Sequence, residues 1–221
     1  MSDLFSNPTP RRSFLGRVAA AAAVTGVSSL LPGQLVAATE ATASADATLE
    51  AWFGRLKGKH RIVFDAPEPN QGFGAIWPRV YLNTTEATYP GEGASAMLIL
   101  RHNGLPLALN DAVWAKYKLG EMFSIKSGET PATSNIYATI TTLPLPGIGI
   151  VELLKGGVLV GACDLALTVY SSMAAQKMGM DAAAVRKEWV AGLLPGVQIV
   201  PSGVFAVSRA QEFNCSYCFA G

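Results

Sequence analysis

The sequence has few of the residues that carry chemistry or charge in most enzymes. Of its 221 residues, three are cysteine, two are histidine and 15% are charged. Three cysteines are too few for a disulfide scaffold of this length, so the fold has to rely on a packed core. Lysine and arginine number 17 against 16 acidic residues, and this balance argues against a nucleic-acid-binding protein.

Several widespread sequence motifs are also missing. The chain has no Walker loop, no zinc-protease motif of two histidines around a glutamate, and no serine hydrolase elbow, which excludes the commonest sites of those classes. Gly72-Phe73-Gly74 and Gly147-Ile148-Gly149 both lack the third glycine of a dinucleotide-binding loop. We therefore expect no cofactor and no metal.

The first 38 residues have the parts of a twin-arginine signal peptide. Arg11 and Arg12 precede an apolar, alanine-rich run over residues 18–31, and residues 36–38 supply the small side chains before a signal-peptidase cut. The run has 14 residues, whereas about 20 are needed to cross a bilayer. We therefore expect no stable membrane span and a mature protein in the periplasm, with an uncleaved N-terminal anchor as the alternative.

The mature chain has the length of a single domain. Cleavage after Ala38 removes three of the 17 basic and one of the 16 acidic residues, which leaves 183 residues with 14 basic and 15 acidic side chains. We expect a flexible linker at residues 39–51 and one domain at residues 52–221. Charged residues make up about 16% of the mature chain against the usual ~25%. This shortage favours a buried subunit interface, so we expect an oligomer.

Strand-like and helix-like segments alternate along the mature chain. The expected strands are short apolar runs at residues 60–65, 94–100, 158–162, 197–200 and 216–219. Helical patterns occupy residues 72–85, 106–119, 148–154, 164–178, 181–192 and 204–213. Between them, residues 124–147 are rich in Thr, Ser and Pro and indicate a long functional or interface loop. The alternation predicts an α/β domain with a mostly parallel sheet of about five strands and helices on both faces.

Cys163 carries the sharpest chemical signal in the sequence. It follows an expected strand and precedes a helix, and ligands gather at the carboxyl ends of strands in open parallel sheets. Free N–H groups and the helix dipole at such a junction favour a thiolate. The alternative is a small residue of the core, since free cysteine is among the most buried residue types.

His102 is the second candidate site residue. It follows the expected strand at residues 94–100. If that strand neighbours the one before Cys163, both side chains emerge at one edge of the sheet, from strands about 5 Å apart. A histidine near a thiol can take up its proton, and a loop histidine bonded to backbone is the alternative. His60 begins the expected strand at residues 60–65 and is expected at the opposite end of the sheet, with no role.

Cys215 and Cys218 have the two-residue gap of redox dithiols and zinc knuckles. In a terminal strand, however, positions i and i+3 point to opposite faces of the sheet. A zinc site would need further ligands, and the sequence has no second cysteine pair. We expect these cysteines to be structural or to act as a secondary redox partner.

Three segments around and after Cys163 carry a family likeness: residues 157–167, GVLVGACDLAL, residues 193–204, LLPGVQIVPSGV, and the Ala- and Arg-containing segment at 206–212. In these segments the chain resembles the DsrE/DsrF-like family. Arg101 and His102 match a histidine-containing strand end of that family. The loop at 124–147 and the two C-terminal cysteines fall outside the pattern and resemble marks of an exported branch.

The resemblance implies a compact α/β fold, assembly into homo- or hetero-oligomers and, as in some relatives, sulfur carried as a cysteine persulfide. Cys163 would then act here as a persulfide or thiol carrier in sulfur metabolism. The resemblance also implies a sulfur donor or acceptor protein as partner. A second hypothesis remains open, in which the protein is a non-catalytic oligomeric binding module and Cys163 is only a core residue. The accessibility and reactivity of the thiol separate the two.

Overall fold

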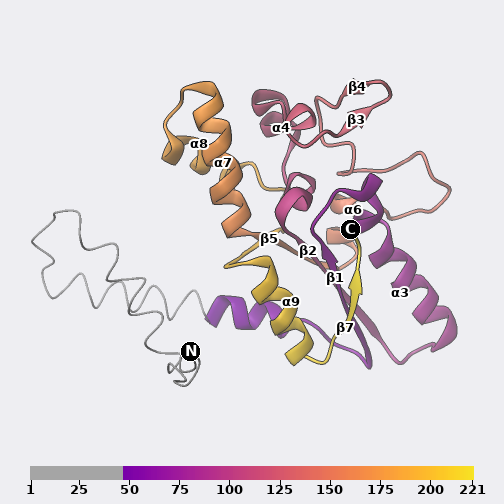
Figure 1. Cartoon of the computed structure of the whole chain (residues 1–221). Coiled ribbons are helices and arrows are strands. Elements are labelled where there is room, and N and C mark those ends of the chain that lie inside the picture. The colour runs from indigo at the N-terminus through magenta and orange to yellow at the C-terminus, as the bar shows by residue number, and fades with distance from the viewer. Residues whose placement is uncertain (1–46) are drawn as a thin grey trace, which may run out of the picture. The chain divides into compact units, whose positions relative to one another are not determined.

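A computed structural model describes residues 47–221, and a five-stranded parallel sheet forms its centre (Figure 1). The strand order is β6-β5-β2-β1-β7. The strands are β1 (His60–Ala66), β2 (Ala94–Leu100), β5 (Leu159–Cys163), β6 (Gln198–Val200) and β7 (Ser216–Phe219). The predicted α/β class and parallel sheet are confirmed.

Helices cover both faces of the sheet because alternate strand residues enter two separate cores. Phe64, Leu98 and Val160 face the larger core, and Val63 and Met97 face the smaller one. The larger core includes residues of α6 (Ile150–Lys155), α7 (Asp164–Met178) and α8 (Ala182–Ala191), with α3 (Trp77–Thr88) packed against it. Helical residues 47–53 and α9 (Gly203–Glu212) cover the smaller core.

The domain begins slightly earlier than predicted. Leu49, Trp52 and Phe53 are buried in the smaller core, and Arg209 of α9 holds Glu50 through two hydrogen bonds of 3.0 and 2.6 Å. The predicted linker at 39–51 is therefore wrong in its last residues. The predicted signal peptide and residues 39–46 of the linker lie outside the described residues.

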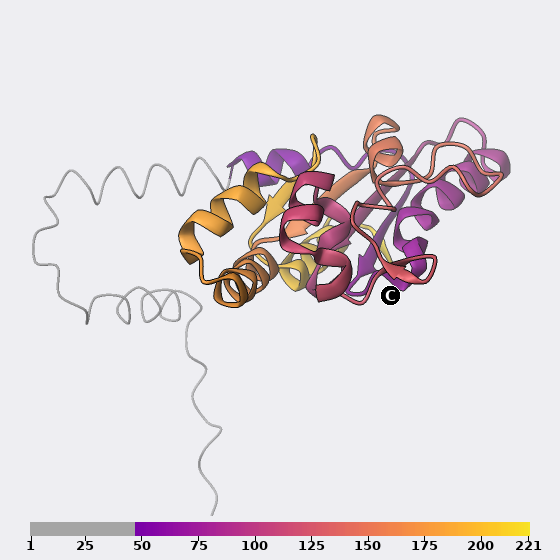
Figure 2. The ribbon, with the colours of Figure 1, turned by 90° about the horizontal axis from the view of Figure 1, so that it is seen from above.

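The chain reverses its direction across the sheet after β6. Strands β1, β2, β5 and β6 are successive neighbours, and α9 then returns the chain over the other face to β7, beside β1. Figure 2 shows α7 and α8 at one end of the sheet and α3 at the other. The carboxyl ends of β5 and β6 therefore lead into helices on opposite faces, an arrangement that opens a crevice for ligands in parallel sheets.

Two predicted helices differ from the observed elements. The prediction at 72–85 is wrong in its first residues, where a 3-10 segment, η1 (Asn70–Ala75), precedes α3. Asn70, Gln71 and Gly72 have φ angles of 39°, 52° and 87°, and such a left-handed run cannot belong to a right-handed helix.

The single helix predicted at 106–119 is also wrong. The chain instead forms η2 (His102–Ala108), α4 (Asp111–Tyr117) and α5 (Leu119–Met122). Leu109 is extended and bridges to Leu193, and the Asn110 side chain caps α4 by accepting the Val113 N–H at 3.1 Å. A cap of this kind starts a new helix rather than continuing an old one.

The segment at residues 124–147 is mostly irregular, as predicted, but it contains a short hairpin of β3 (Lys126–Ser127) and β4 (Thr130–Pro131). Buried Asn135 anchors it to η2, because its amide donates to the carbonyls of Leu107 and Leu109 at 3.0 and 2.7 Å. The remaining predicted helices, at 148–154, 164–178, 181–192 and 204–213, are confirmed within two residues at each end.

Candidate functional site

Cys163 is the last residue of β5 and the N-cap of α7. Its Sγ accepts the backbone N–H of Ala166 at 3.4 Å, and the residue is 5% exposed. N–H groups in the first turn of a helix lack intrahelical partners, and their partial positive charge favours an anionic sulfur. The predicted position at a strand-to-helix junction is confirmed.

Asp164, the next residue, would oppose a thiolate if its charge were free. Its carboxylate instead pairs with Arg186 of α8, and Arg186 also donates from Nε to Thr168 Oγ1 at 3.1 Å. The paired guanidinium offsets the negative charge beside the sulfur, so helix N–H groups and nearby cations decide the local potential.

Arg101 is a fixed cation close to this sulfur. It follows β2 and binds Asp65 at the end of β1 in two parallel contacts, Nε to Oδ1 at 2.7 Å and Nη2 to Oδ2 at 2.9 Å. The hydroxyl of Tyr217 donates to the same carboxylate at 3.1 Å. The hydrogen bond to Asp65 raises the pKa of Arg101, partial burial opposes the rise, and the negative charge of Asp65 adds to it.

The position of the Arg101 side chain depends on Gly203, the first residue of α9. A Cβ atom at residue 203 would lie 2.5 Å from Cβ and 2.7 Å from Cδ of Arg101. Real Cβ atoms do not approach other atoms so closely. A glycine at this position therefore leaves room for the Arg101 side chain beside the start of α9, and Asp65 binds the guanidinium there.

A cavity of about 490 Å³ opens at this edge of the sheet, between α7 and α9. Its size and largely apolar wall are typical of small-molecule sites. Such sites often occur where the strand order of a parallel sheet reverses. The lining residues are Arg101, His102, Cys163, Leu165, Ala166, Val169, Tyr170, Met173, Ser202, Gly203 and Val204.

His102 and Cys163 line the same cavity, as expected from the neighbouring strands β2 and β5. The imidazole does not bond to the thiol, however. Its Nδ1 bonds to Glu68 Oε1 at 3.2 Å, and its side chain is 59% exposed. Glu68 also accepts two hydrogen bonds from Asn103. His60 lies at the other end of β1 and bonds to Glu92.

Cys215 and Cys218 face opposite sides of the sheet. Cys215 belongs to the smaller core, whereas Cys218 packs against the larger one. Burial raises the pKa of Cys215 from 9.0 to about 11, although nearby Arg61 opposes this shift. All three cysteines are free thiols. The two C-terminal thiols therefore do not meet as a dithiol, in agreement with the strand geometry expected from the sequence.

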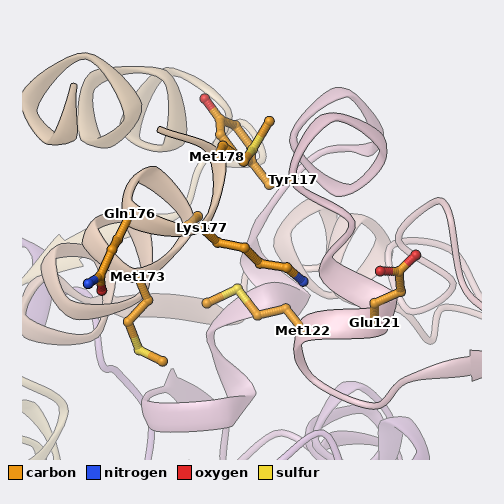
Figure 3. Close-up of a pocket in the computed structure, with 8 residues that line it drawn as sticks. Tyr117, Glu121, Met122, Met173, Gln176, Lys177 and Met178 are labelled. Atoms are coloured by element: carbon orange, nitrogen blue, oxygen red, sulfur yellow. The ribbon is translucent and has the colours of Figure 1, made fainter. Parts of the chain in front are cut away.

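A second cavity, of about 440 Å³, lies between α7 and the α4–α5 segment. Three thioethers line it, but Figure 3 shows Met178 on one side of Lys177 and both Met122 and Met173 on the other. Three sulfurs that do not converge cannot form a soft-metal site. Within residues 47–221, no group of three or more His, Cys, Asp or Glu side chains could hold a metal ion.

No helix among residues 47–221 is both long enough and apolar enough to cross a bilayer.

Arg101 and Asp65 are the site residues that the sequence reasoning left without a role. Both residues can be recognised in the sequence by their places at strand ends. In the register of β1 and β2, Asp65 lies opposite Ile99 and Ala66 opposite Leu100, so Arg101, the residue after Leu100, lies beside the end of β1. An acidic residue ending one strand and a basic residue following its parallel neighbour are brought to one edge of the sheet.

Comparisons with known proteins leave the family open. No family model matches the chain, and no curated protein matches it. Among solved structures, a protein of unknown function from Methanobacterium thermoautotrophicum, MTH1491, is similar with a TM-score of 0.40 and 18% sequence identity. The similarity covers 73% of this chain and 99% of that chain. The likeness to the DsrE/DsrF-like family remains a prediction from the sequence.

Proposed function

We propose that this protein is an exported, DsrE-like sulfur carrier that acts in the periplasm and holds sulfur as a persulfide on Cys163. The observation that carries the proposal is the hydrogen bond from the Ala166 N–H to Cys163 Sγ at the start of α7, beside a cavity lined by Arg101. Helix N-termini and nearby guanidinium groups are the surroundings in which cysteine thiolates form and react. Export rests on the paired arginines and apolar run of the N-terminus.

Loading requires one exchange of sulfur bonds. The Cys163 thiolate attacks the outer sulfur of a persulfide donor, R–S–SH, and a new S–S bond forms as the donor S–S bond breaks. The products are Cys163–S–SH and R–S⁻, so the sulfur of Cys163 is oxidised and the inner sulfur of the donor is reduced. Transfer to an acceptor thiolate, on a partner protein, repeats the exchange and restores the Cys163 thiolate.

Arg101 and His102 have separate parts in this proposal. Arg101 supplies a fixed positive charge to the Cys163 thiolate and to the leaving thiolate, and Asp65 keeps its guanidinium in place. His102 is assigned proton uptake from the Cys163 thiol. Its Nδ1 bonds to Glu68, while its Nε2 has no hydrogen-bond partner within residues 47–221. In this proposal Nε2 is therefore the nitrogen that accepts the proton of the thiol.

A non-catalytic oligomeric binding module is the second candidate function. The exposed apolar side chains of Leu165, Val169 and Val204 around the cavity favour it, because large apolar patches often mark contacts with other chains. The 5% exposure of Cys163 also suits a core residue. In this case the thiol would be inert, and the oligomer would survive its replacement.

Mass spectrometry of the intact mature protein tests the proposal. Exposure to polysulfide should add one sulfur atom to the wild type, and the addition should be removed by a reducing agent. Cys163→Ser should abolish the sulfur addition. The matched variant Cys218→Ser should retain it, because Cys218 lies on edge strand β7, three strands away from β5. Equal loading of wild type and Cys163→Ser would overturn the proposal.

A further inference from the structure

The cavity beside Cys163 has an apolar wall that is open to water. Leu165, Val169 and Met173 follow one another at a spacing of four along α7 and are 61%, 46% and 51% exposed. Val204, at the start of α9, is 65% exposed. All four line the same cavity. Exposed apolar side chains that converge on one hollow, rather than scatter singly, indicate a binding surface.

The end of the cavity nearest the sheet is polar and presents one free edge of a guanidinium group. Cys163, His102, Ser202 and Arg101 line it, and the lining contains no acidic side chain. Asp65 occupies Nε and Nη2 of Arg101, and the remaining Nη1 has no hydrogen-bond partner within residues 47–221. The helices α7 and α9 both begin here, and their N-termini add to the positive potential.

The apolar wall and the polar end of the cavity suit different parts of one ligand. A wall of four aliphatic or thioether side chains stabilises an apolar body by removing its surface from water. An arginine edge and two helix N-termini stabilise an anion. A small inorganic anion would leave the apolar wall exposed, and a highly charged peptide thiol would have to desolvate its charges against that wall.

Building on the proposed function, we infer that the sulfur donor or acceptor bound at Cys163 is a low-molecular-weight organic sulfur compound with an apolar body and a single anionic sulfur group. In the loading step its apolar body lies along Leu165, Val169 and Met173. Its outer sulfur bonds to Cys163, the donor S–S bond breaks, and the organic thiolate that leaves is held by Arg101.

Alkyl methanethiosulfonates with methyl, butyl and hexyl chains probe this inference. The Cys163 thiolate attacks the sulfur that bears the alkyl group, a mixed disulfide forms, and methanesulfinate leaves. For each reagent, the rate at Cys163 in the native protein is divided by the rate at the same cysteine in the unfolded chain. We expect this normalised rate to be at least about tenfold higher for the hexyl reagent than for the methyl reagent, because added methylenes are buried in the cavity. Rates are read from the peptide that contains Cys163.

Two matched variants locate the effect. Val169 and Leu143 are both 46% exposed, but Leu143 lies on the loop at 124–147 and lines a different cavity. Val169→Gln should reduce the hexyl-to-methyl ratio by at least about threefold, since it makes the wall polar. Leu143→Gln should leave the ratio unchanged.

The outcomes separate this inference from the proposed function. If Cys163 reacts with polysulfide and with all three reagents at a ratio near one, the inference is wrong and the sulfur-carrier proposal stands, with the apolar wall left as a contact surface for another chain. An equal decrease of the ratio in Val169→Gln and Leu143→Gln also contradicts it. If Cys163 reacts with neither polysulfide nor any thiosulfonate, both proposals fail.

Discussion

Cys163 and Cys215 are almost equally buried, at 5% and 7% exposed, yet they lie in opposite chemical surroundings. Cys163 accepts an N–H at the start of a helix, close to a guanidinium and at the wall of a cavity. Cys215 lies in the smaller core under α9, where burial raises the pKa of its thiol to about 11. The partners of a thiol, more than its exposed area, therefore decide whether it can react.

The largest expected difference concerns Cys215. A rise in its pKa from 9.0 to about 11 lowers the thiolate fraction about a hundredfold at pH values well below 9. Iodoacetamide should therefore label Cys215 in the native protein at least about a hundredfold more slowly than in the unfolded chain. The native rate should still be rising with pH at pH 10, where that of the unfolded chain has levelled off. Native and unfolded rates that agree within a factor of two at pH 8 would contradict the burial argument.

Removal of the fixed cation should bring Cys163 closer to Cys215 in reactivity. Arg101→Gln alone would leave the buried Asp65 carboxylate without its main partner and would destabilise the fold, so the informative variant is Arg101→Gln with Asp65→Asn. The double variant removes the guanidinium, which lines the cavity, together with the carboxylate, which does not, so the labelling of Cys163 should slow by up to about tenfold. The rate for Cys215 should not change and serves as the internal control. An unchanged rate at Cys163 would show that Arg101 does not act on the sulfur.

A smaller effect is expected when Arg101 is kept but displaced. In Gly203→Ala the added Cβ would lie 2.5 Å from Cβ of Arg101, so the start of α9 and the end of β2 must move apart, and Arg101 is displaced with them. Labelling of Cys163 should slow by roughly threefold, because the charge moves without being lost. Combining Gly203→Ala with the double variant of Arg101 and Asp65 should add nothing further. Additive effects would assign the loss to the start of α9 itself.

The smallest expected effect involves Asp164. In Arg186→Gln its carboxylate loses the guanidinium that pairs with it, and the freed negative charge should slow Cys163 labelling by about twofold, less at high salt. Asp164→Asn added to Arg186→Gln should restore the rate. A double variant that stays as slow as Arg186→Gln would attribute the loss to α8 packing rather than to charge.

The sequence predicted the sheet well because each strand is a short apolar run bounded by glycine, proline or polar residues. The helices at 164–178 and 181–192 were equally clear, since Asp181 caps one and Gly179 ends the other. The segment at 106–119 was not predictable from spacing alone. Its leucines suit one helix, but the cap at Asn110 and the bridge between Leu109 and Leu193 divide it, and that bridge is a tertiary contact.

The candidate site was predicted in part. Position after a strand identified Cys163 and His102, and the order of the strands brought them to one cavity. The interaction of Glu68 with the His102 ring and that of Arg186 with Asp164 could not be read from the sequence. Both depend on side chains from distant elements, over 34 and 22 residues of sequence separation. The sequence gives Arg101 no role of its own, because the only chemical signal at this strand end is the adjacent histidine.

The most direct test of a reactive thiol at Cys163 is its iodoacetamide labelling rate at pH 7 in the native mature protein, divided by the rate of the same cysteine in the urea-unfolded chain. The start of α7 and the nearby Arg101 predict a ratio above one despite burial of the residue, with His102→Ala lowering it. A ratio below one, comparable to that of Cys215, would contradict the sulfur-carrier account and leave Cys163 as part of the core.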